Sequence, residues 1–231
     1  NPGAGRVLVD RNYQDRYNDP GSVVTEPNAR GRSVMRFSAD GARVFVEGDG
    51  ATREGAYPFL DLMDLKSGET ERVWRSAQGE YESVVGVLDE GGRKLVTYRE
   101  SGSDPANLRV RDLDGGVTQL TNFPDPAPQL AGATRQLITY TRDDGVELSG
   151  TLYLPAGYDK DRDGPLPLLM WAYPAEFTDA AVAGQVVDTD NRFVRPGGIS
   201  HLFLLTQGYA VLDNPTMPII GKDGAEPNDT Y

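Results

Sequence analysis

The residues best suited to nucleophilic chemistry are the single histidine, His201, and the serine beside it, because the chain has no cysteine. An activated serine of this kind sits in a G-x-S-x-G turn, and its acid and base follow later in the chain. The nearest match is GISHL (198–202), in which Leu202 replaces the second glycine and the pattern is helical. His201 also precedes any such turn, which is the wrong order for a base. We therefore expect a packed or solvent-facing helix position for His201 and no Ser-Asp-His triad within these 231 residues.

Two further motifs resemble ion or phosphate sites, and each lacks a required residue. DKDRDG (159–164) matches the first half of a calcium loop, but Met170 stands where the loop needs a glutamate. The pair GK (221–222) resembles the end of a phosphate-binding loop, but Asp223 replaces the required Ser or Thr. We expect a solvated turn in the first case, and we predict no metal and no cofactor. Asp213 ends an apolar stretch before an Asn-Pro turn, where it either caps that turn, our default prediction, or orients neighbouring loops.

The composition restricts the classes of partner. The chain carries 23 basic and 35 acidic residues, a net charge of −12, so it lacks the basic footprint needed for nucleic acid or an anionic membrane surface. No apolar run approaches the roughly 18 residues of a membrane-spanning helix. The absence of cysteine excludes disulfides without deciding the compartment. We expect a soluble protein of the cytoplasm or periplasm that binds no nucleic acid and does not insert into membranes.

Residues 33–124 alternate short strand patterns with glycine-containing turns. Asp64-Leu65 recurs as Asp112-Leu113, 48 residues later, at the same place in a pair of hairpins. Two four-stranded units with this period predict β-propeller blades, and the alternative is a chance match of turn residues. Two blades leave unpaired edges, so we expect further blades upstream or from another chain. The predicted strands are 33–37, 42–48, 57–65 and 69–75, followed by 83–89, 93–100, 107–113 and 117–123.

A proline-rich segment, 124–130, ends the repeat, and a different pattern follows. Alternating strands are predicted at 135–142 and 146–155, around a DDG turn. The continuous apolar run 165–174 is typical of a strand buried on both faces. A short helix at 201–208, ended by Gly208, precedes a second buried strand at 209–215. Antiparallel strands that lead into parallel ones predict the first part of an α/β sheet.

Six stretches of the sequence resemble a known protein family over nearly the whole chain, from about Asp15 to Tyr231. These stretches are DRYNDPG (15–21), PFLDLMDLKSGETERVWRS (58–76), LTNFPDPAPQL (120–130), GTLYLPAGYDKDRDGPLPLLMWAYPAEF (150–177), NRF (191–193) and YAVLDNPTMPIIG (209–221). They are similar to the prolyl oligopeptidase family of serine peptidases, and within it to the glutamyl endopeptidase branch of bacteria and chloroplasts. The family joins a β-propeller to a C-terminal α/β-hydrolase domain.

The resemblance implies a fold class of all-β propeller blades followed by the N-terminal part of an α/β-hydrolase domain. Residues 1–130 would be the C-terminal blades, and residues 131–231 would begin the peptidase domain and stop before its nucleophile elbow. We expect the chain to be a piece of a longer protein, since neither end reads as a natural terminus. The implied function is a serine-type endopeptidase or oligopeptidase that hydrolyses oligopeptides through an acyl-enzyme, with the branch preference for cleavage after Glu.

Three residues receive roles from this resemblance. Tyr173, in AYPAEF, matches the family's tyrosine that donates its phenolic O–H in the oxyanion hole. Pro174 stands where many relatives have Gly or Ala, so the local backbone is expected to differ, and the alternative is a tyrosine packed at a strand end. A substrate Glu would need a cation, best an arginine. Arg192 and Arg195, in the loop 184–198, are the candidates, with surface arginines as the alternative.

Two other classes of function remain open at this level. One is a non-catalytic, propeller-containing binding protein, and the other is an esterase on the same scaffold, because a fold alone does not fix the substrate. We expect the 231 residues alone to be inactive and not to fold as a stable monomer, since both sheets are unfinished. Peptide substrate is the expected partner, and a homo-oligomer would form through the full-length protein.

Overall fold

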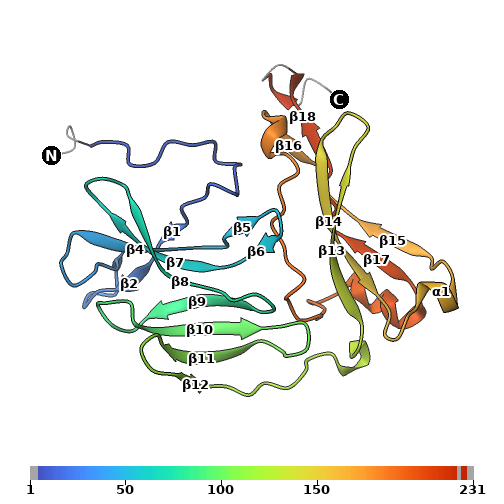
Figure 1. The fold of residues 1–231 in the computed structure, drawn as a ribbon, viewed down its shortest axis with the longest axis horizontal. Helices are drawn as coiled ribbons and strands as arrows, with labels where there is room; N and C mark the ends of the chain where they lie inside the picture. The colour runs from blue at the N-terminus through green and yellow to red at the C-terminus, as the bar shows by residue number, and fades with distance from the viewer. Residues whose placement is uncertain (1–4, 223–224, 228–231) are drawn as a thin grey trace.

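A computed structural model describes residues 5–222 and 225–227, and most of its regular structure is β-sheet. Three four-stranded sheets form the bulk of the molecule. Figure 1 shows the first two in the N-terminal half, coloured blue to green, and the third in the C-terminal half, coloured yellow to red. The chain therefore has the change of pattern near residue 124 that the sequence predicts.

The first sheet is antiparallel and has the strand order β1-β4-β7-β8. Its strands are β1 (Ser22–Val23), β4 (Arg43–Gly48), β7 (Phe59–Asp64) and β8 (Thr70–Arg75). The three longer strands lie within two residues of their predicted bounds. The turn between β7 and β8 forms because the Asp64 carboxylate accepts hydrogen bonds from the backbone N–H groups of Lys66 and Ser67, both at 2.7 Å. Gly68 then adopts a φ of 79°, which favours glycine.

The predicted strand 33–37 does not form the edge of this sheet. Instead, β3 (Ser33–Met35) pairs with β2 (Thr25–Pro27) in a separate ribbon, and only Phe37 bridges to Val44 of β4. Asn28 closes the ribbon because its side-chain oxygen accepts from the backbone of Arg30 at 2.9 Å. The edge position belongs to β1, whose two residues are too few to give a strand pattern. A second small ribbon joins β5 (Ala51–Thr52) to β6 (Gly55–Ala56).

The second sheet is also antiparallel and contains β9 (Tyr81–Val87), β10 (Lys94–Glu100), β11 (Asn107–Asp112) and β12 (Val117–Gln119). The first three strands agree with the prediction to within two residues, whereas β12 ends four residues early. A bulge leaves Val85 without a register partner, since Gly86 pairs with Val96 and Val84 pairs with Thr97. Val85 is accordingly exposed.

The first two sheets share one hydrophobic core. Phe45 and Leu60 of the first sheet pack with Val84 and Leu95 of the second, and three of these four side chains are fully buried. Burial of such side chains contributes about 1.5–3 kcal/mol each. Two packed four-stranded sheets are what the repeat predicts. The described residues form no closed ring of sheets, so the propeller itself stays a prediction.

The third sheet has the order β13-β14-β17-β15. Its strands are β13 (Thr134–Thr141), β14 (Glu147–Leu154), β17 (Ala210–Asp213) and β15 (Leu168–Trp171). The hairpin β13–β14 and the pair β14–β17 are antiparallel, whereas β15 and β17 are parallel, as the sequence predicts. One face is covered by the 3-10 helix η4 (His201–Gln207), which packs Leu202 and Leu205 against Val211 and Tyr153.

The prediction that 165–174 is buried on both faces is wrong for the described structure. β15 is an edge strand that pairs only with β17 among the described residues. Leu168, Met170 and Trp171 are each more than half exposed. The apolar run has the composition of a central strand, but a strand is buried only where other strands flank it on both sides. β17, by contrast, is buried as predicted.

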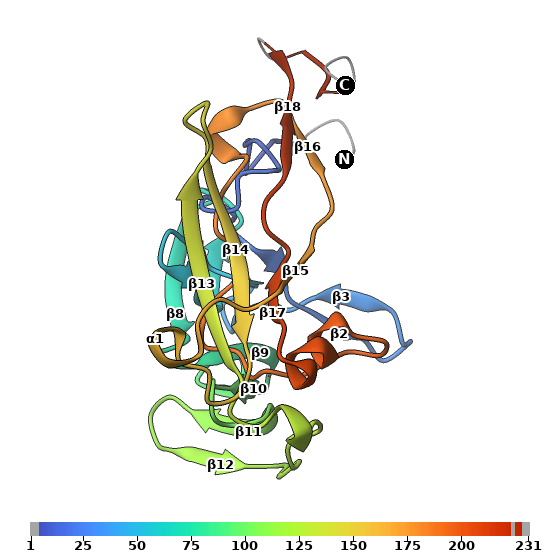
Figure 2. The same cartoon turned by 90° about the vertical axis from the view of Figure 1, so that its right-hand side faces the viewer.

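Short elements complete the chain. They are η2 (Pro128–Leu130), α1 (Lys160–Asp163), β16 (Ala175–Phe177), η3 (Ala180–Val182) and β18 (Pro218–Ile220). β16 and β18 pair in parallel, and Figure 2 shows them past the ends of β15 and β17, level with the tip of the β13–β14 hairpin. The helix predicted at 201–208 is a 3-10 helix, and Gly208 ends it with a φ of 78°. Among the described residues, no helix is long and apolar enough to cross a membrane.

Candidate functional site

The candidate site lies where the two parallel strands of the third sheet end. Trp171, the last residue of β15, is the register partner of Asp213, the last residue of β17. The backbone N–H of Asn214 donates to the carbonyl of Trp171 at 2.8 Å, which ties the two strand ends together. In open α/β sheets, ligands bind beyond the carboxyl ends of the strands. Side chains directly after Trp171 and Asp213 therefore occupy the expected place of functional groups.

The turn after β17 is fixed by hydrogen bonds to β14. Asn214 has a φ of 46°, in the left-handed region that asparagine tolerates better than most residues. The backbone N–H of Thr216 donates to the carbonyl of Ser149 at 2.7 Å, and the Thr216 hydroxyl accepts from the N–H of Ser149 at 2.8 Å. The predicted turn is present. The Asp213 carboxylate does not cap it, however, and faces His201 instead.

Tyr173 projects from the segment between β15 and β16. Its side chain is 87% exposed, and none of the described residues hydrogen-bonds to its hydroxyl. The backbone after it is held in place because Ala175 N–H donates to the carbonyl of Met217 at 3.2 Å, where the β16–β18 pairing begins. A phenolic O–H without a partner in the described part of the chain, on a segment anchored at both ends, can donate to a ligand.

His201 and Asp213 form a contact that the sequence analysis did not anticipate. Nε2 of His201 lies 2.9 Å from Oδ1 of Asp213, and the imidazole stacks on the Trp171 ring with centroids 5.2 Å apart and planes inclined by 22°. Of the two positions expected for His201, packed or solvent-facing, the structure shows the packed one, since its side chain is 21% exposed. The sequence analysis considered His201 and Asp213 in separate motifs and did not predict that they meet. Their pairing depends on η4 running back along β17, which no local pattern reveals.

Arg192 is engaged with the second sheet. Its Nε lies 3.5 Å from Oε1 of Glu100, and its guanidinium lies 4.2 Å from the ring centroid of Tyr81. The Glu100 side chain is 3% exposed and also accepts from the backbone N–H of Phe193 at 3.2 Å. Burial raises the pKa of Tyr81, and the nearby Arg192 charge partly offsets that rise. Arg192 therefore compensates a buried carboxylate.

Arg195 has a different environment. Its Nη1 donates to the Tyr98 hydroxyl at 3.3 Å, and this hydrogen bond raises the pKa of Arg195. No carboxylate among the described residues lies within ion-pair distance of it. The charge of Glu100, the buried partner of Arg192, also raises the pKa of Arg195, but the two side chains form no ion pair. Neither Arg192 nor Arg195 contacts Tyr173 among the described residues, so the structure leaves the three predicted roles unconnected.

The loop 184–198 connects the third sheet to the N-terminal half through two aspartates that the sequence analysis missed. Asp188 accepts from Arg135 of β13 and from the Thr151 hydroxyl of β14 at 2.8 Å. Asp190 accepts from the backbone N–H of Leu137. The Asp188 carbonyl accepts from the N–H of Ala56 at 3.0 Å, which joins the loop to the separate β5–β6 ribbon. The sequence signal for this contact is Arg135, since an arginine within a predicted strand needs an acidic partner such as Asp188.

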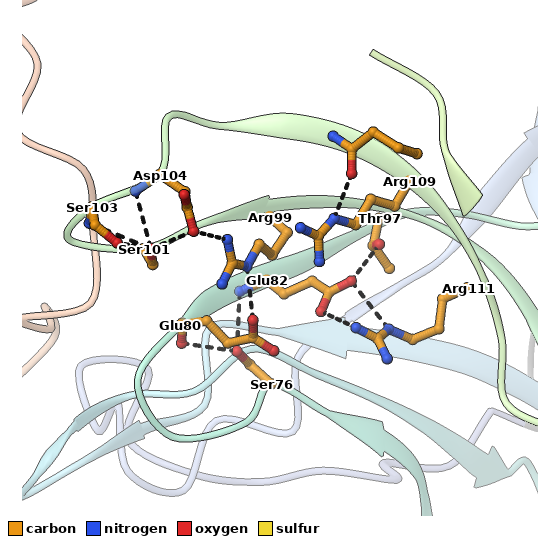
Figure 3. Close-up of polar contacts among 11 residues, drawn as sticks. Ser76, Glu80, Glu82, Thr97, Arg99, Ser101, Ser103, Asp104, Arg109 and Arg111 are labelled. Atoms are coloured by element: carbon orange, nitrogen blue, oxygen red, sulfur yellow. Dashed lines mark hydrogen bonds and ion pairs between the residues drawn. The ribbon is translucent and has the colours of Figure 1, made fainter. Parts of the chain in front are cut away.

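A buried ionic network occupies the second sheet (Figure 3). Glu82 is completely buried, and its carboxylate accepts from the Thr97 hydroxyl at 2.5 Å and from Arg111 at 2.6 and 3.1 Å. Arg99 joins Glu80 and Asp104, each at 2.7 Å, at the same sheet. Every one of these carboxylates is matched by donors, so the network reads as structural support rather than as a reactive site.

The acidic stretch 159–164 forms one helical turn. The Asp159 carboxylate caps it by accepting from the backbone N–H of Asp161 at 2.9 Å. Asp163 is paired with Arg162, whose hydrogen bond lowers the pKa of Asp163 to about 2. These carboxylates satisfy backbone and arginine donors, as expected for a solvated turn.

Comparison with known proteins gives two sequence relatives. The chain is 41% identical over 240 residues to a probable chloroplastic glutamyl endopeptidase of Arabidopsis thaliana, and the alignment covers 98% of this chain and 25% of the relative. It is 41% identical over 239 residues to the protein of the same name in Oryza sativa subsp. japonica, covering 98% and 26%. The chain thus spans about a quarter of the length of these relatives. No family model matches.

Solved structures give more distant similarity. The apo AtxE2 isopeptidase superposes with a TM-score of 0.46 at 18% identity, over 83% of this chain and 28% of that one. A variant of the same isopeptidase with Astexin3-dC4 bound gives a TM-score of 0.47 at 16% identity, over 87% and 29%. The sequence relatives support a peptidase family for this chain.

Proposed function

From this relationship to proteins named as peptidases, we propose that the chain is part of a serine peptidase that hydrolyses oligopeptides through an acyl-enzyme. The observation that carries the proposal is 41% identity over 98% of the chain to glutamyl endopeptidases. The packed antiparallel sheets support the assignment of residues 1–130 to propeller blades. The parallel pair β15–β17, joined to an antiparallel hairpin, supports residues 131–231 as the beginning of an α/β-hydrolase domain.

In this proposal Tyr173 donates its phenolic O–H to the oxyanion of the tetrahedral intermediate. Its free hydroxyl and its place just beyond a parallel strand support the role. The nucleophile, acid and base lie outside this sequence, which has no G-x-S-x-G. A donor aimed at developing charge acts on the transition state and not on substrate binding.

Cleavage after Glu is the finer part of the proposal, and the structure favours one arginine over the other for it. A substrate carboxylate would have to displace the buried Glu100 from Arg192. Arg195 would give up only its hydrogen bond to the Tyr98 hydroxyl, so binding an incoming carboxylate costs it less free energy than it would cost Arg192. We therefore assign the P1 carboxylate to Arg195 and a supporting role to Arg192.

The test is a matched pair of peptides assayed with the full-length protein. One peptide carries Glu before the cleaved bond, and the other carries Gln, which has the same shape without the charge. The proposal expects hydrolysis that a serine-directed phosphonate abolishes and a preference for Glu that falls in Arg195→Gln. Hydrolysis of a simple p-nitrophenyl ester without cleavage of either peptide would identify an esterase. No covalent labelling and no turnover would contradict an acyl-enzyme altogether.

A further inference from the structure

The cluster of His201, Asp213 and Trp171 is not used by the proposed chemistry, yet it lies beside the segment that carries Tyr173. His201 begins η4, where the Ser200 hydroxyl caps the helix by accepting from the N–H of Leu202 at 3.2 Å. Asp213 and Trp171 are register partners on neighbouring parallel strands. Three separate elements therefore converge on one histidine ring, and one of them leads directly to Tyr173.

The attraction within this cluster depends on charge. Nε2 of His201 and Oδ1 of Asp213 are both sealed from solvent and lie 2.9 Å apart, but neither atom makes a properly directed hydrogen bond to any described residue. With a neutral imidazole, a buried carboxylate oxygen would have no compensating partner, which is costly. With an imidazolium, the carboxylate is compensated, and the cation also interacts favourably with the indole face.

Among the described residues, Asp213 is the one acidic side chain within ion-pair distance of His201. From β14, Tyr153 faces the cluster, and burial raises the pKa of Tyr153 to about 12, with Asp213 contributing to the rise. Tyr153 is therefore uncharged near neutral pH. From β15 the contact is Trp171, which does not titrate, and η2 has no ionisable side chain.

The nearest further charges are already paired. Arg135 lies 5.4 Å from the ring centroid of Tyr153 and is bound to Asp188. Asp213 is therefore the ion-pair partner of His201 in this cluster.

From this geometry we propose that the His201–Asp213 pair positions Trp171, and through it the segment that presents Tyr173, making His201 and Asp213 positioning residues for the oxyanion donor. The part that concerns Tyr173 rests on the function proposed above. Trp171, two residues before Tyr173 on an edge strand, links the pair to that segment.

The first experiment reads Trp171 directly and needs no activity. The full-length protein is labelled with 5-fluorotryptophan, and the Trp171 fluorine resonance is identified by its loss in Trp171→Phe. We expect this resonance to shift in Asp213→Asn, which removes the charge opposite the imidazole. The same substitution should leave it unchanged in a His201→Phe background, which keeps a ring but removes the partner of Asp213. Trp74 is the internal control, because it lies on β8 of the first sheet and packs against Arg111. A Trp171 resonance that does not respond to Asp213→Asn, or that shifts equally in both backgrounds, overturns the proposal.

The second experiment asks whether the pair acts through Tyr173. We expect His201→Phe to lower kcat about tenfold with little change in KM, since small misplacement of a catalytic group costs one to two orders of magnitude. In a Tyr173→Phe background the same substitution should have no further effect, because the group that it positions is already gone. Equal losses in both backgrounds would show a general structural role and contradict the positioning claim. A protein with no peptidase activity would refute the proposed function, while the fluorine resonance of Trp171 would still test the pair.

Discussion

The second sheet and the carboxyl ends of β15 and β17 differ in how their polar groups are compensated. In the second sheet, the completely buried Glu82 has three donor contacts from Thr97 and Arg111. At the end of the third sheet, the sealed atoms of His201 and Asp213 have only each other, and Tyr173 has no described partner. Saturated networks stabilise a fold, whereas unsaturated groups at strand ends are available for chemistry.

The two regions also differ in how their strands are covered. The first two sheets bury Phe45 and Leu95 in a common core. β15 of the third sheet exposes Met170 and Trp171 at an open edge. Both halves have a buried core, and they differ in that the candidate chemistry lies at the open edge of the third sheet.

The largest expected effect comes from breaking the buried network. Glu82→Ala leaves Arg111 and Thr97 without their acceptor, and removal of one partner of a buried ion pair costs about 3–5 kcal/mol. Hydrogen exchange of the β9 and β10 amides in the full-length protein measures the loss. Glu71→Ala is the matched control, because its pair with Arg43 is largely exposed and is worth about 0–1 kcal/mol. Equal protection in the two variants would contradict the contrast between the regions.

A smaller effect is expected where the two N-terminal sheets meet. Gly92 has a φ of 68°, and a Cβ there would lie 2.5 Å from Cε1 of Phe45. Gly41 has nearly the same φ, 67°, and open space around it. Gly92→Ala should therefore lower the free energy of unfolding by about 1–3 kcal/mol more than Gly41→Ala, since overpacking is added to backbone strain. Urea denaturation of both variants measures the difference in the free energy of unfolding. Equal values would contradict the prediction and show that the Phe45 ring moves aside at no cost.

The smallest effect concerns hairpin turns, which should behave alike in both regions. A hydrogen bond from Ser38 lowers the pKa of Asp40 to about 2, and one from Arg142 lowers the pKa of Asp144 to about 2. Because the folded pKa lies below the unfolded value, each carboxylate stabilises the fold above about pH 4 and loses this effect as pH falls toward 2.

Unfolding measured between pH 5 and 2 should thus depend less on pH in Asp40→Asn and in Asp144→Asn. Added salt should weaken the contribution of Asp144 more than that of Asp40, because only the former relies first on an arginine. An unchanged acid dependence in both variants would contradict the account of these turns.

Local sequence patterns predict most of the strands for a physical reason. Turn glycines and the alternation of side chains act within a few residues, so β4, β7, β9, β10 and β11 lie within two residues of their expected bounds. The sequence does not predict the edge strand β1, because two residues are too few to show an alternation of side chains. It does not predict the exposure of β15 either, since burial depends on which strands flank it.

In the candidate site, too, local motifs were predictable and contacts between distant residues were not. Tyr173 was predicted from a family motif, and the structure shows its hydroxyl free at a strand end, while its role stays a proposal. The partners of Arg192 and Asp213 were not predictable. Glu100 lies 92 residues before Arg192, and His201 meets Asp213 only because η4 folds back over β17. Contacts of this kind come from topology and leave no local pattern.

The central claim is that this chain contributes Tyr173 to the oxyanion hole of a peptidase, and one measurement tests it most directly. Steady-state kinetics of Tyr173→Phe in the full-length protein, with active sites titrated by a serine-directed phosphonate, separate kcat from KM. Loss of one oxyanion donor predicts a fall in kcat of about 10²–10³-fold with KM nearly unchanged. A variant that labels normally and keeps the parent kcat would contradict the account.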